Sequence, residues 1–503
     1  MIKNFIKNKT NILIIITTLI TGLIIHLPLY TKNILTADVL LNNFYYSSYS
    51  WEVSLGRFGL FIVGLLKQYL VIPHIEIFIS LILVSFISIL IINLFNIKNK
   101  LFQIIISIII TICPNISAIL LFNYCSLPYI LAFFCSILAV YILLKEKNKY
   151  IKNILPIILI IISESMYQSF IQVSITLLVL YYINELLKNK FNFTEFIRNM
   201  ITIGIGLISY FIIMKLSVLL LHINLSDYSS ANSFGLKNIL NIPQNILTTY
   251  KTFYNFYFTN KIVNNTNVFN HIINISLLLI LITSITYKTI KNKLYTKNII
   301  ILFLLILVIP ICTNFILLII TDTSMQLLMS SAYILLIPFV ISLCEENKYL
   351  KILLLIISLL LIKNYIIQDS ATYKSLETTY NKTYKIASNI VDNINKLGYD
   401  KKVMITGNLS NNKYYNYNTN LDIDNIYNLN YGFIANKSLF WDEYVNVKNG
   451  WTRYLYEYLG VNINFIDENT YNEITKSKEF KDMENYPNKN SIKLINNTIV
   501  IKL

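Results

Sequence analysis

The residues best suited to chemistry lie between positions 36 and 59, directly after the first apolar run of the chain. This stretch holds two carboxylates and an arginine, Asp38, Glu52 and Arg57, although only 14% of all residues are charged. A carboxylate can remove a proton from a reacting hydroxyl group. An arginine can bind a phosphate through two parallel N–H groups, because its donors form a planar fork. The pattern therefore indicates catalysis by Asp38 or Glu52 and phosphate binding by Arg57.

Aromatic residues accompany these side chains in the sequence: Tyr45, Tyr46, Tyr49 and Trp51. Aromatic faces can stack on a sugar ring, and we predict that Trp51 contacts the substrate. Tyr and Trp are equally typical of a membrane interface, however. For Glu52 and Arg57 the alternative is an ordinary surface pair five residues apart, which would contribute little. The residue types by themselves leave both interpretations open.

Three further polar residues are candidates for the same site. Lys67 follows Arg57 by one short apolar segment, and we expect it to contribute positive charge to the same phosphate. Tyr167 and Gln168 lie in a polar interruption of the long apolar stretch Ile154–Leu187. Polar groups at membrane depth are costly unless they are buried in protein or line a cavity. We therefore expect Tyr167 and Gln168 to contact a bound substrate.

The sequence predicts neither a metal nor a cofactor. The five cysteines are scattered and form no CxxC pair or Cys/His spacing typical of a metal site. Asp422 and Asp424 match a short acidic pattern, but in a segment rich in Asp and Asn this match is best explained by chance. His26 stands alone near the end of an apolar run, where a packing role is expected.

Composition places these candidates in a membrane protein. Of 503 residues, 55% are hydrophobic and 14% are charged, whereas about a quarter of the residues of a soluble domain are charged. The net charge of +16 could indicate nucleic-acid binding. The basic residues, however, cluster in short loops between apolar runs, as expected for cytoplasmic loops under the positive-inside rule. We therefore predict a lipid-bilayer environment and no nucleic-acid partner.

The apolar runs predict an α-helical polytopic protein with about eleven spans, since one span needs about 20 apolar residues. Nine runs are clear, at 12–29, 75–94, 102–122, 127–144, 201–221, 272–287, 299–320, 331–343 and 350–367. We interpret Ile154–Leu187 as two further short helices, because one helix of that length would be about 50 Å long. This count places every basic loop, Lys188–Arg198 among them, on the side of the N-terminus, and the C-terminus on the opposite side.

Three segments are then predicted to be extracytoplasmic. Residues 1–368 form the transmembrane domain, with exterior loops at 30–74 and 224–270. Residues 369–503 lack a spanning run and are long enough to bury a core of their own. We expect a helix over Thr372–Leu397 capped by Gly398, a strand at Val403–Ile405, a helix at Trp451–Leu459 and a closing strand at Thr498–Leu503. The tail is therefore predicted to be an extracytoplasmic α/β domain.

Three motifs resemble the bacterial Gtr type II membrane glucosyltransferases. The most specific is Asp38 followed by Trp51-Glu-Val-Ser-Leu-Gly-Arg57-Phe-Gly59, which is similar to the acidic residue and Gly-Arg-aromatic signature of the first exterior loop in that family. Ser165-Met-Tyr167-Gln168 is similar to its Tyr-Gln motif, and the tail looks like its exterior domain. Family members carry two adjacent acidic residues where this chain has Asp38 alone. This difference leaves open whether Glu52 supplies the second carboxylate.

The resemblance implies a fold of the glycosyltransferase C type and a location in the bacterial cytoplasmic membrane. It implies transfer of a hexose, most simply glucose, from undecaprenyl phosphate to a cell-surface glycan outside that membrane. The partners would be the polyprenyl-phosphate-linked sugar donor, the surface glycan acceptor and the bilayer. A lipid-linked-sugar flippase or transporter is the main alternative, although the internal repeats typical of such proteins are not evident. A glycan polymerase or ligase is a third possibility, and a structural scaffold is the least favoured.

Overall fold

The computed structural model describes residues 8–42, 46, 49–226, 241–258, 268–319, 326–407, 409 and 444–503. The chain divides into two compact units. The first is built from the described residues up to 27 and between 46 and 369, and the second from residues 28–42 and those after 369.

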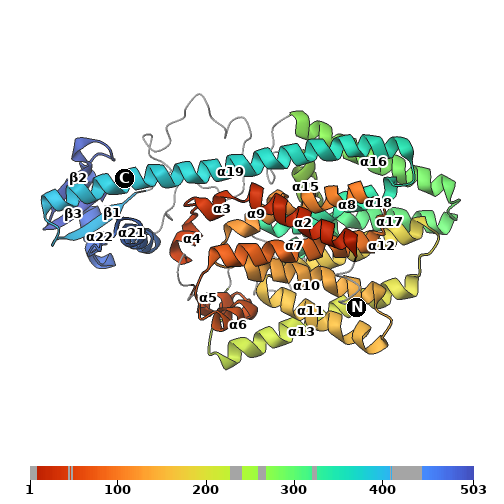
Figure 1. Cartoon of the computed structure of the whole chain (residues 1–503). Coiled ribbons are helices and arrows are strands. Elements are labelled where there is room, and N and C mark those ends of the chain that lie inside the picture. Colours follow the sequence, from red (N-terminus) through yellow and green to blue (C-terminus); the bar gives the residue numbers. More distant parts are fainter. Residues whose placement is uncertain are drawn as a thin grey trace. The chain divides into compact units, whose positions relative to one another are not determined.

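The first unit is helical (Figure 1). Its elements are α2 (Lys9–Ile25), α5 (Tyr49–Ser54), α6 (Phe58–Leu66), α7 (Pro73–Phe95), α8 (Lys100–Thr111), α9 (Pro114–Leu121), α10 (Ser126–Lys145), α11 (Lys149–Met166), η1 (Gln168–Phe170), α12 (Ile171–Leu187), α13 (Phe193–Leu220), α15 (Ile242–Phe258), α16 (Val268–Lys291), α17 (Thr296–Thr313), η3 (Phe315–Leu318), η4 (Leu327–Leu335) and α18 (Leu336–Cys344). Helix α19 (Lys348–Leu397) begins in this unit and continues into the second. Helices dominate because each satisfies its backbone hydrogen bonds internally, as a lipid environment requires.

Side-chain caps define several of these helices at their polar ends. Asn8, Asn99, Asn148 and Asn192 accept backbone N–H bonds at the starts of α2, α8, α11 and α13. Asparagine is a favoured N-cap because its side-chain oxygen reaches donors that have no partner in the first turn. The frequent Asn residues between apolar runs therefore mark helix starts.

Within the described part of the chain, nine helical segments are long and apolar enough to cross a membrane. Helix α2 is shorter, with 17 residues, and α11 contains Pro156 and Glu164. The protein is thus a multi-helix membrane protein, as the composition predicted. The count of eleven crossings, which includes α2 and α11, stays a prediction.

The predicted interruption of Ile154–Leu187 is present. Helix α11 ends at Met166, Tyr167 is extended at φ −158° and ψ 109°, and η1 leads into α12. Several other boundaries differ from the prediction: α2 ends at Ile25, α13 begins at Phe193, α17 ends at Thr313, and α15 lies in the predicted exterior loop 224–270. Two further differences divide or join predicted helices. The run 102–122 is broken before Pro114, which starts α9 as its first residue, a position that proline favours. The run 350–367 and the helix expected over Thr372–Leu397 are one continuous helix of 50 residues, because no residue between them stops it.

The core of the first unit surrounds α12. In the apolar window of Gln168–Leu187, 89% of the residues are buried, against 22% in α13 and in α16. Helix α10 packs against α7 and α11, α2 packs against α7 and α8, and α12 packs against α17. The exposed apolar residues of α13 and α16 give these helices the surface expected for contact with lipid.

The second unit combines short helices with a three-stranded sheet of order β1-β3-β2. Its elements are α3 (Pro28–Thr31), α4 (Ala37–Asn42), β1 (Lys402–Thr406), α21 (Tyr444–Leu459), α22 (Glu468–Lys476), α23 (Lys478–Lys481), η7 (Lys489–Ser491), β2 (Ile492–Ile495) and β3 (Thr498–Lys502). β1 and β3 are parallel, with Val403 opposite Ile499, and β2 and β3 are antiparallel. The strand predicted at Val403–Ile405 lies within β1, and the closing strand predicted over Thr498–Leu503 is β3, which ends one residue earlier. Gly398 follows the end of α19 at φ +120°.

The topology can be tested by cysteine labelling, because the five native cysteines are all buried. Lys190 and Lys478 are exposed and lie on opposite sides of the membrane in the predicted topology. A membrane-impermeant maleimide should label Lys478→Cys in intact cells and Lys190→Cys only after permeabilisation. Labelling of both, or of Lys190→Cys alone, in intact cells would contradict the predicted orientation.

Candidate functional site

A tight turn between α5 and α6 brings Glu52 and Arg57 to the same side. The backbone N–H of Arg57 donates to the Glu52 carbonyl at 2.8 Å, and that of Gly56 donates to the Val53 carbonyl at 2.9 Å. Gly56 closes the turn at φ +84°, a conformation that favours glycine. The side chain of Arg57 then leaves the turn as the residue preceding the first turn of α6.

Three groups hold the Arg57 guanidinium. Its Nη1 lies 3.3 Å from Glu52 Oε2, its Nε donates to Gln168 Oε1 at 3.4 Å, and its carbon lies 5.0 Å from the centre of the Tyr167 ring. Glu52, Arg57, Tyr167 and Gln168 are therefore brought together, as the sequence led us to expect. Tyr167 and Gln168 reach Arg57 because the break between α11 and α12 turns them out of the helix.

Both carboxylate oxygens of Glu52 accept hydrogen bonds from neighbouring side chains. Oε2 accepts from Arg57, and Oε1 accepts from the Tyr46 hydroxyl. The residue is only 6% exposed, so the alternative of an ordinary surface pair is wrong. Burial raises the pKa of Tyr46 well above its ordinary value, and the Glu52 carboxylate raises it further. Tyr46 therefore stays protonated and continues to donate to Glu52.

Gln168 also ties the turn to α13. Its Nε2 donates to the Leu55 carbonyl at 2.6 Å and to the Tyr210 hydroxyl at 3.0 Å. The Tyr210 hydroxyl in turn donates to the Gly56 carbonyl at 3.0 Å. We call Tyr46, Glu52, Arg57, Tyr167, Gln168 and Tyr210 the Arg57 cluster. Its members come from three stretches of the chain, at 46–57, 167–168 and 210, so Arg57 is held from several directions.

Lys67 lies beside this cluster. Its Nζ donates to Glu76 Oε1 at 2.7 Å and to the Tyr124 carbonyl at 3.1 Å. The Tyr124 ring is 4.8 Å from that of Tyr46, centre to centre, which connects Lys67 to the Arg57 cluster. The pKa of the buried Cys125 thiol lies well above its ordinary value, because burial raises it and the Glu52 carboxylate raises it further. The positive charges of Arg57 and Lys67 partly offset this rise.

The remaining predicted residues lie elsewhere. The Trp51 side chain is 47% exposed on α5, where a ligand can reach it. Asp38 is half-buried in the first turn of α4 and belongs to the second unit, with α21 packed against its helix. Thr36 caps α4 by accepting the N–H of Val39 at 3.2 Å. A carboxylate in a first helical turn is favoured by the helix dipole.

Some interpretations fall on residues outside the described part of the chain, namely Tyr45, Asp422 and Asp424, together with the side chain of Tyr49. Among the described residues, no group of three His, Cys, Asp or Glu side chains is placed to hold a metal ion.

Sequence reasoning missed the partners that hold the site. Tyr46 was treated only as an aromatic residue, and Glu76 and Tyr210 were not singled out. A signal for both was present, because Glu76 and Tyr210 are polar residues within or beside long apolar runs. Such residues usually face the protein interior and find a partner there.

Two glycines allow these segments to approach. A Cβ at Gly56 would lie 2.7 Å from Tyr210 Oη and 3.1 Å from Gln168 Nε2. A Cβ at Gly59 would lie 2.4 Å from Ser165 Oγ and 2.9 Å from the Ser165 carbonyl oxygen. The Gly-x-x-Gly spacing around Arg57 therefore serves close packing against the end of α11.

We expect Gly56→Ala to destabilise the protein and to displace Arg57. A non-glycine residue in the left-handed region costs about 1–2 kcal/mol, and the added methyl group would collide with Tyr210. Thermal unfolding of the purified protein should show a lower midpoint, together with reduced activity. Gly204→Ala is the matched control, because no atom lies within 4 Å of a Cβ there. Equal midpoints for the two variants would contradict this explanation.

Comparison with known proteins adds one finding. The family model described as "Glucosyl transferase GtrII" matches residues 27–343, more than half of the chain. The match includes the whole Arg57 cluster. Searches of the curated proteins and of the solved structures found no match.

Proposed function

The chain belongs to the GtrII glucosyl transferase family, and we propose that it moves a hexose, taken to be glucose, from undecaprenyl phosphate to a cell-surface glycan. The reaction takes place on the extracytoplasmic face of the bacterial cytoplasmic membrane. Residues 369–503 form an extracytoplasmic domain in this proposal, and residues 1–368 form the membrane domain with its exterior loops.

The proposed phosphate donor is supported by the hydrogen bonds that the Arg57 guanidinium makes and by the N–H groups that it leaves open. Its guanidinium has five N–H donors, and among the described residues its partners engage only Nε and Nη1. Nη2 is thus available to a ligand, and the side chain keeps 21% of its surface exposed. A phosphate oxygen is the group for which a fixed, partly open guanidinium is best suited. Lys67, which is paired with Glu76 at 2.7 Å, is the second cation of the proposal.

The structure supports different roles for the two carboxylates. Both oxygens of Glu52 are engaged, by Tyr46 and Arg57, so Glu52 orients Arg57 and neutralises part of its charge. From its place in the sequence we assign the base to Asp38, which lies in the first turn of α4. The base accepts the proton of the attacking acceptor hydroxyl.

The reaction balances as a simple displacement. The acceptor oxygen bonds to the anomeric carbon of the sugar while the bond from that carbon to the phosphate oxygen breaks. Asp38 takes the hydroxyl proton, and polyprenyl phosphate leaves with the electron pair, stabilised by Arg57 and Lys67. Trp51 offers an exposed ring face to the sugar. The buried Tyr167 ring holds Arg57 in this proposal and reaches the substrate only at its edge of the site. The proposal requires neither a metal nor another cofactor.

The proposed function is tested by comparing surface glycans of the wild-type strain, a deletion strain and the complemented strain by mass spectrometry. The deletion should remove one hexose per modified repeat, and complementation should restore it. A second arm uses purified protein in nanodiscs with a labelled hexose on polyprenyl phosphate or on a nucleotide. Unchanged glycans in the deletion strain, or transfer from the nucleotide sugar alone, would reject the proposal.

A further inference from the structure

A cavity of about 300 Å³ lies in the first unit and shares no residue with the Arg57 cluster. Its walls come from seven elements: α9, α15, α16, α17, η4, α18 and α19. This volume is at the lower end of the range for pockets that bind small molecules or parts of larger ones. The proposed transfer at the Arg57 cluster assigns no role to this cavity.

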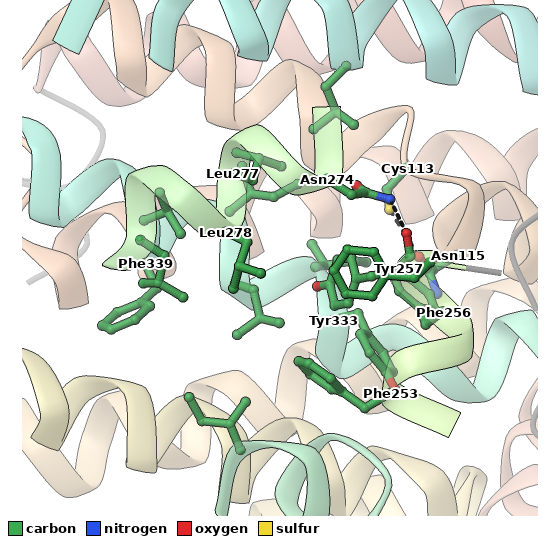
Figure 2. Close-up of a pocket in the computed structure, with 18 of the residues that line it drawn as sticks. Cys113, Asn115, Phe253, Phe256, Tyr257, Asn274, Leu277, Leu278, Tyr333 and Phe339 are labelled. Atoms are coloured by element: carbon green, nitrogen blue, oxygen red, sulfur yellow. Dashed lines mark hydrogen bonds between the residues drawn. The ribbon is translucent and has the colours of Figure 1, made fainter. Parts of the chain in front are cut away.

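The lining is apolar and aromatic, with polar groups gathered at one end. Figure 2 shows Asn274, Cys113 and Asn115 together, and Leu277, Leu278 and Phe339 farther along the cavity. Several aromatic rings lie between, with Phe256 and Tyr333 stacked at 3.9 Å. The side-chain amides at the polar end already have hydrogen-bond partners within the protein. Asn115 donates to the Leu327 carbonyl and to Ser330, and Asn274 donates to the Tyr257 carbonyl.

The cavity wall contains no Asp, Glu, Lys, Arg or His among the described residues. A phosphate or a charged sugar placed there would lose its hydration without gaining a counter-charge, at a high cost. Hydrocarbon, in contrast, gains from burial in proportion to its area. The chemistry of the wall therefore selects an uncharged, apolar occupant.

Two helices indicate the depth of the cavity in the membrane. In α16, Leu278 lies ten residues before Lys288, and in α19 Leu361 lies 13 residues after Lys348. At 1.5 Å per residue these separations are about 15 and 20 Å along the helix. With a hydrocarbon core about 30 Å thick, Leu278 lies near its middle and Leu361 lies in the half remote from the lysine-rich ends. Leu281 and Val340 extend the cavity wall back toward those ends. Under the positive-inside rule the half remote from these lysines is the exterior half.

Helix α9 connects the cavity wall to the residue that hydrogen-bonds Lys67. Pro114 and Asn115 line the cavity at its start, and three residues after its end Tyr124 accepts the hydrogen bond of Lys67. Eight helical residues rise about 12 Å. The helix after it, α10, begins at Ser126 and ends at Lys145, so Tyr124 lies at the exterior end. The cavity is therefore deeper in the membrane than Lys67.

We infer that this cavity holds an isoprenoid segment of the donor's polyprenyl chain while the phosphate is bound by Arg57 and Lys67. The inference rests on the proposed function. A lipid chain must lie deeper than its head group, as the cavity lies deeper than Lys67. The many ring faces suit the double bonds and branching methyl groups of an isoprenoid.

The chain enters from the side. Leu278 lines the cavity and is 43% exposed, and its neighbours Ile275 and Leu279 are 47% and 56% exposed on the same helix. An apolar outer face of this kind is expected to contact lipid. A polyprenyl chain can thus pass from the bilayer beside α16 without crossing water.

The binding test uses polyprenyl phosphate that carries a diazirine within its chain and no sugar. Irradiation in nanodiscs, followed by peptide mass spectrometry, should label α15, α16 or η4 at residues of the cavity wall. Unlabelled polyprenyl phosphate should compete, and a straight-chain phospholipid at the same concentration should not. Labelling only outside the cavity, or equal competition by the phospholipid, would overturn the inference. This readout needs no transfer, so it stands apart from the proposed function.

A kinetic test uses Leu277→Trp, which fills the cavity, and Leu279→Trp as the control on the exposed face of α16. For Leu277→Trp we expect the half-saturating concentration of the polyprenyl donor to rise about tenfold, equivalent to about 1.4 kcal/mol. That of a geranyl-phosphate sugar, whose chain is too short to reach the cavity, should not change. Equal effects on both donors, or effects equal to those of Leu279→Trp, would overturn the inference. If Leu277→Trp fails to fold, the labelling result decides.

Discussion

Asp38→Asn should lower the rate of sugar transfer about 10²–10⁴-fold, the usual cost of losing a general base. Asparagine keeps the size of the side chain and removes only the ability to take a proton. The variant should therefore retain wild-type expression, membrane insertion and thermal unfolding. Its half-saturating donor concentration should also be unchanged, because the phosphate is bound by other residues. The measurement is a transfer assay in nanodiscs with both substrates titrated.

Two controls sharpen the result for Asp38. Asp392→Asn changes an exposed carboxylate on α19 and should leave the rate unaltered. Glu52→Gln should chiefly raise the half-saturating donor concentration, since Glu52 acts by orienting Arg57. A near wild-type rate for Asp38→Asn, combined with a large loss of maximal rate for Glu52→Gln, would transfer the role of base to Glu52.

Arg57→Lys should reduce activity about 10- to 100-fold, even though it preserves the positive charge. Hydrogen bonds to charged groups are worth about 1.5–3 kcal/mol, and lysine cannot maintain the contacts to Glu52 and Gln168 while also offering a planar pair of donors. The loss should appear mainly as a higher half-saturating concentration of the polyprenyl-phosphate sugar. Titration of donor with wild type and variant gives this directly.

The control for Arg57 is Arg198→Lys on α13. Arg198 pairs with Glu195 at 3.3 Å, and its side chain is 57% exposed, so lysine should replace it without effect. If Arg57→Lys also kept the wild-type half-saturation and maximal rate, Arg57 would be a charge that anchors the loop at the membrane surface.

Part of the site was readable from the chain alone. Glu52, Arg57 and the Tyr167-Gln168 break follow from residue type and position, and the break lies where the sequence predicts it, between α11 and α12. The role of Asp38 stays a prediction. The reasons are local: a polar interruption in an apolar run cannot remain helical without cost, and two glycines flank the arginine. The Gln168–Arg57 contact, in contrast, joins residues 111 positions apart, a distance at which spacing carries no information.

The sequence by itself determined the membrane class and the approximate positions of the apolar helices, because transfer to lipid depends on the composition of a single segment. Only the tertiary structure decided that Glu52 is saturated by Tyr46 and Arg57, that Tyr210 supports the turn at Gly56, and that seven elements enclose an uncharged cavity. These features depend on the rotation of each helix about its axis. That rotation is set by the packing of many side chains together, which no single segment of the sequence encodes.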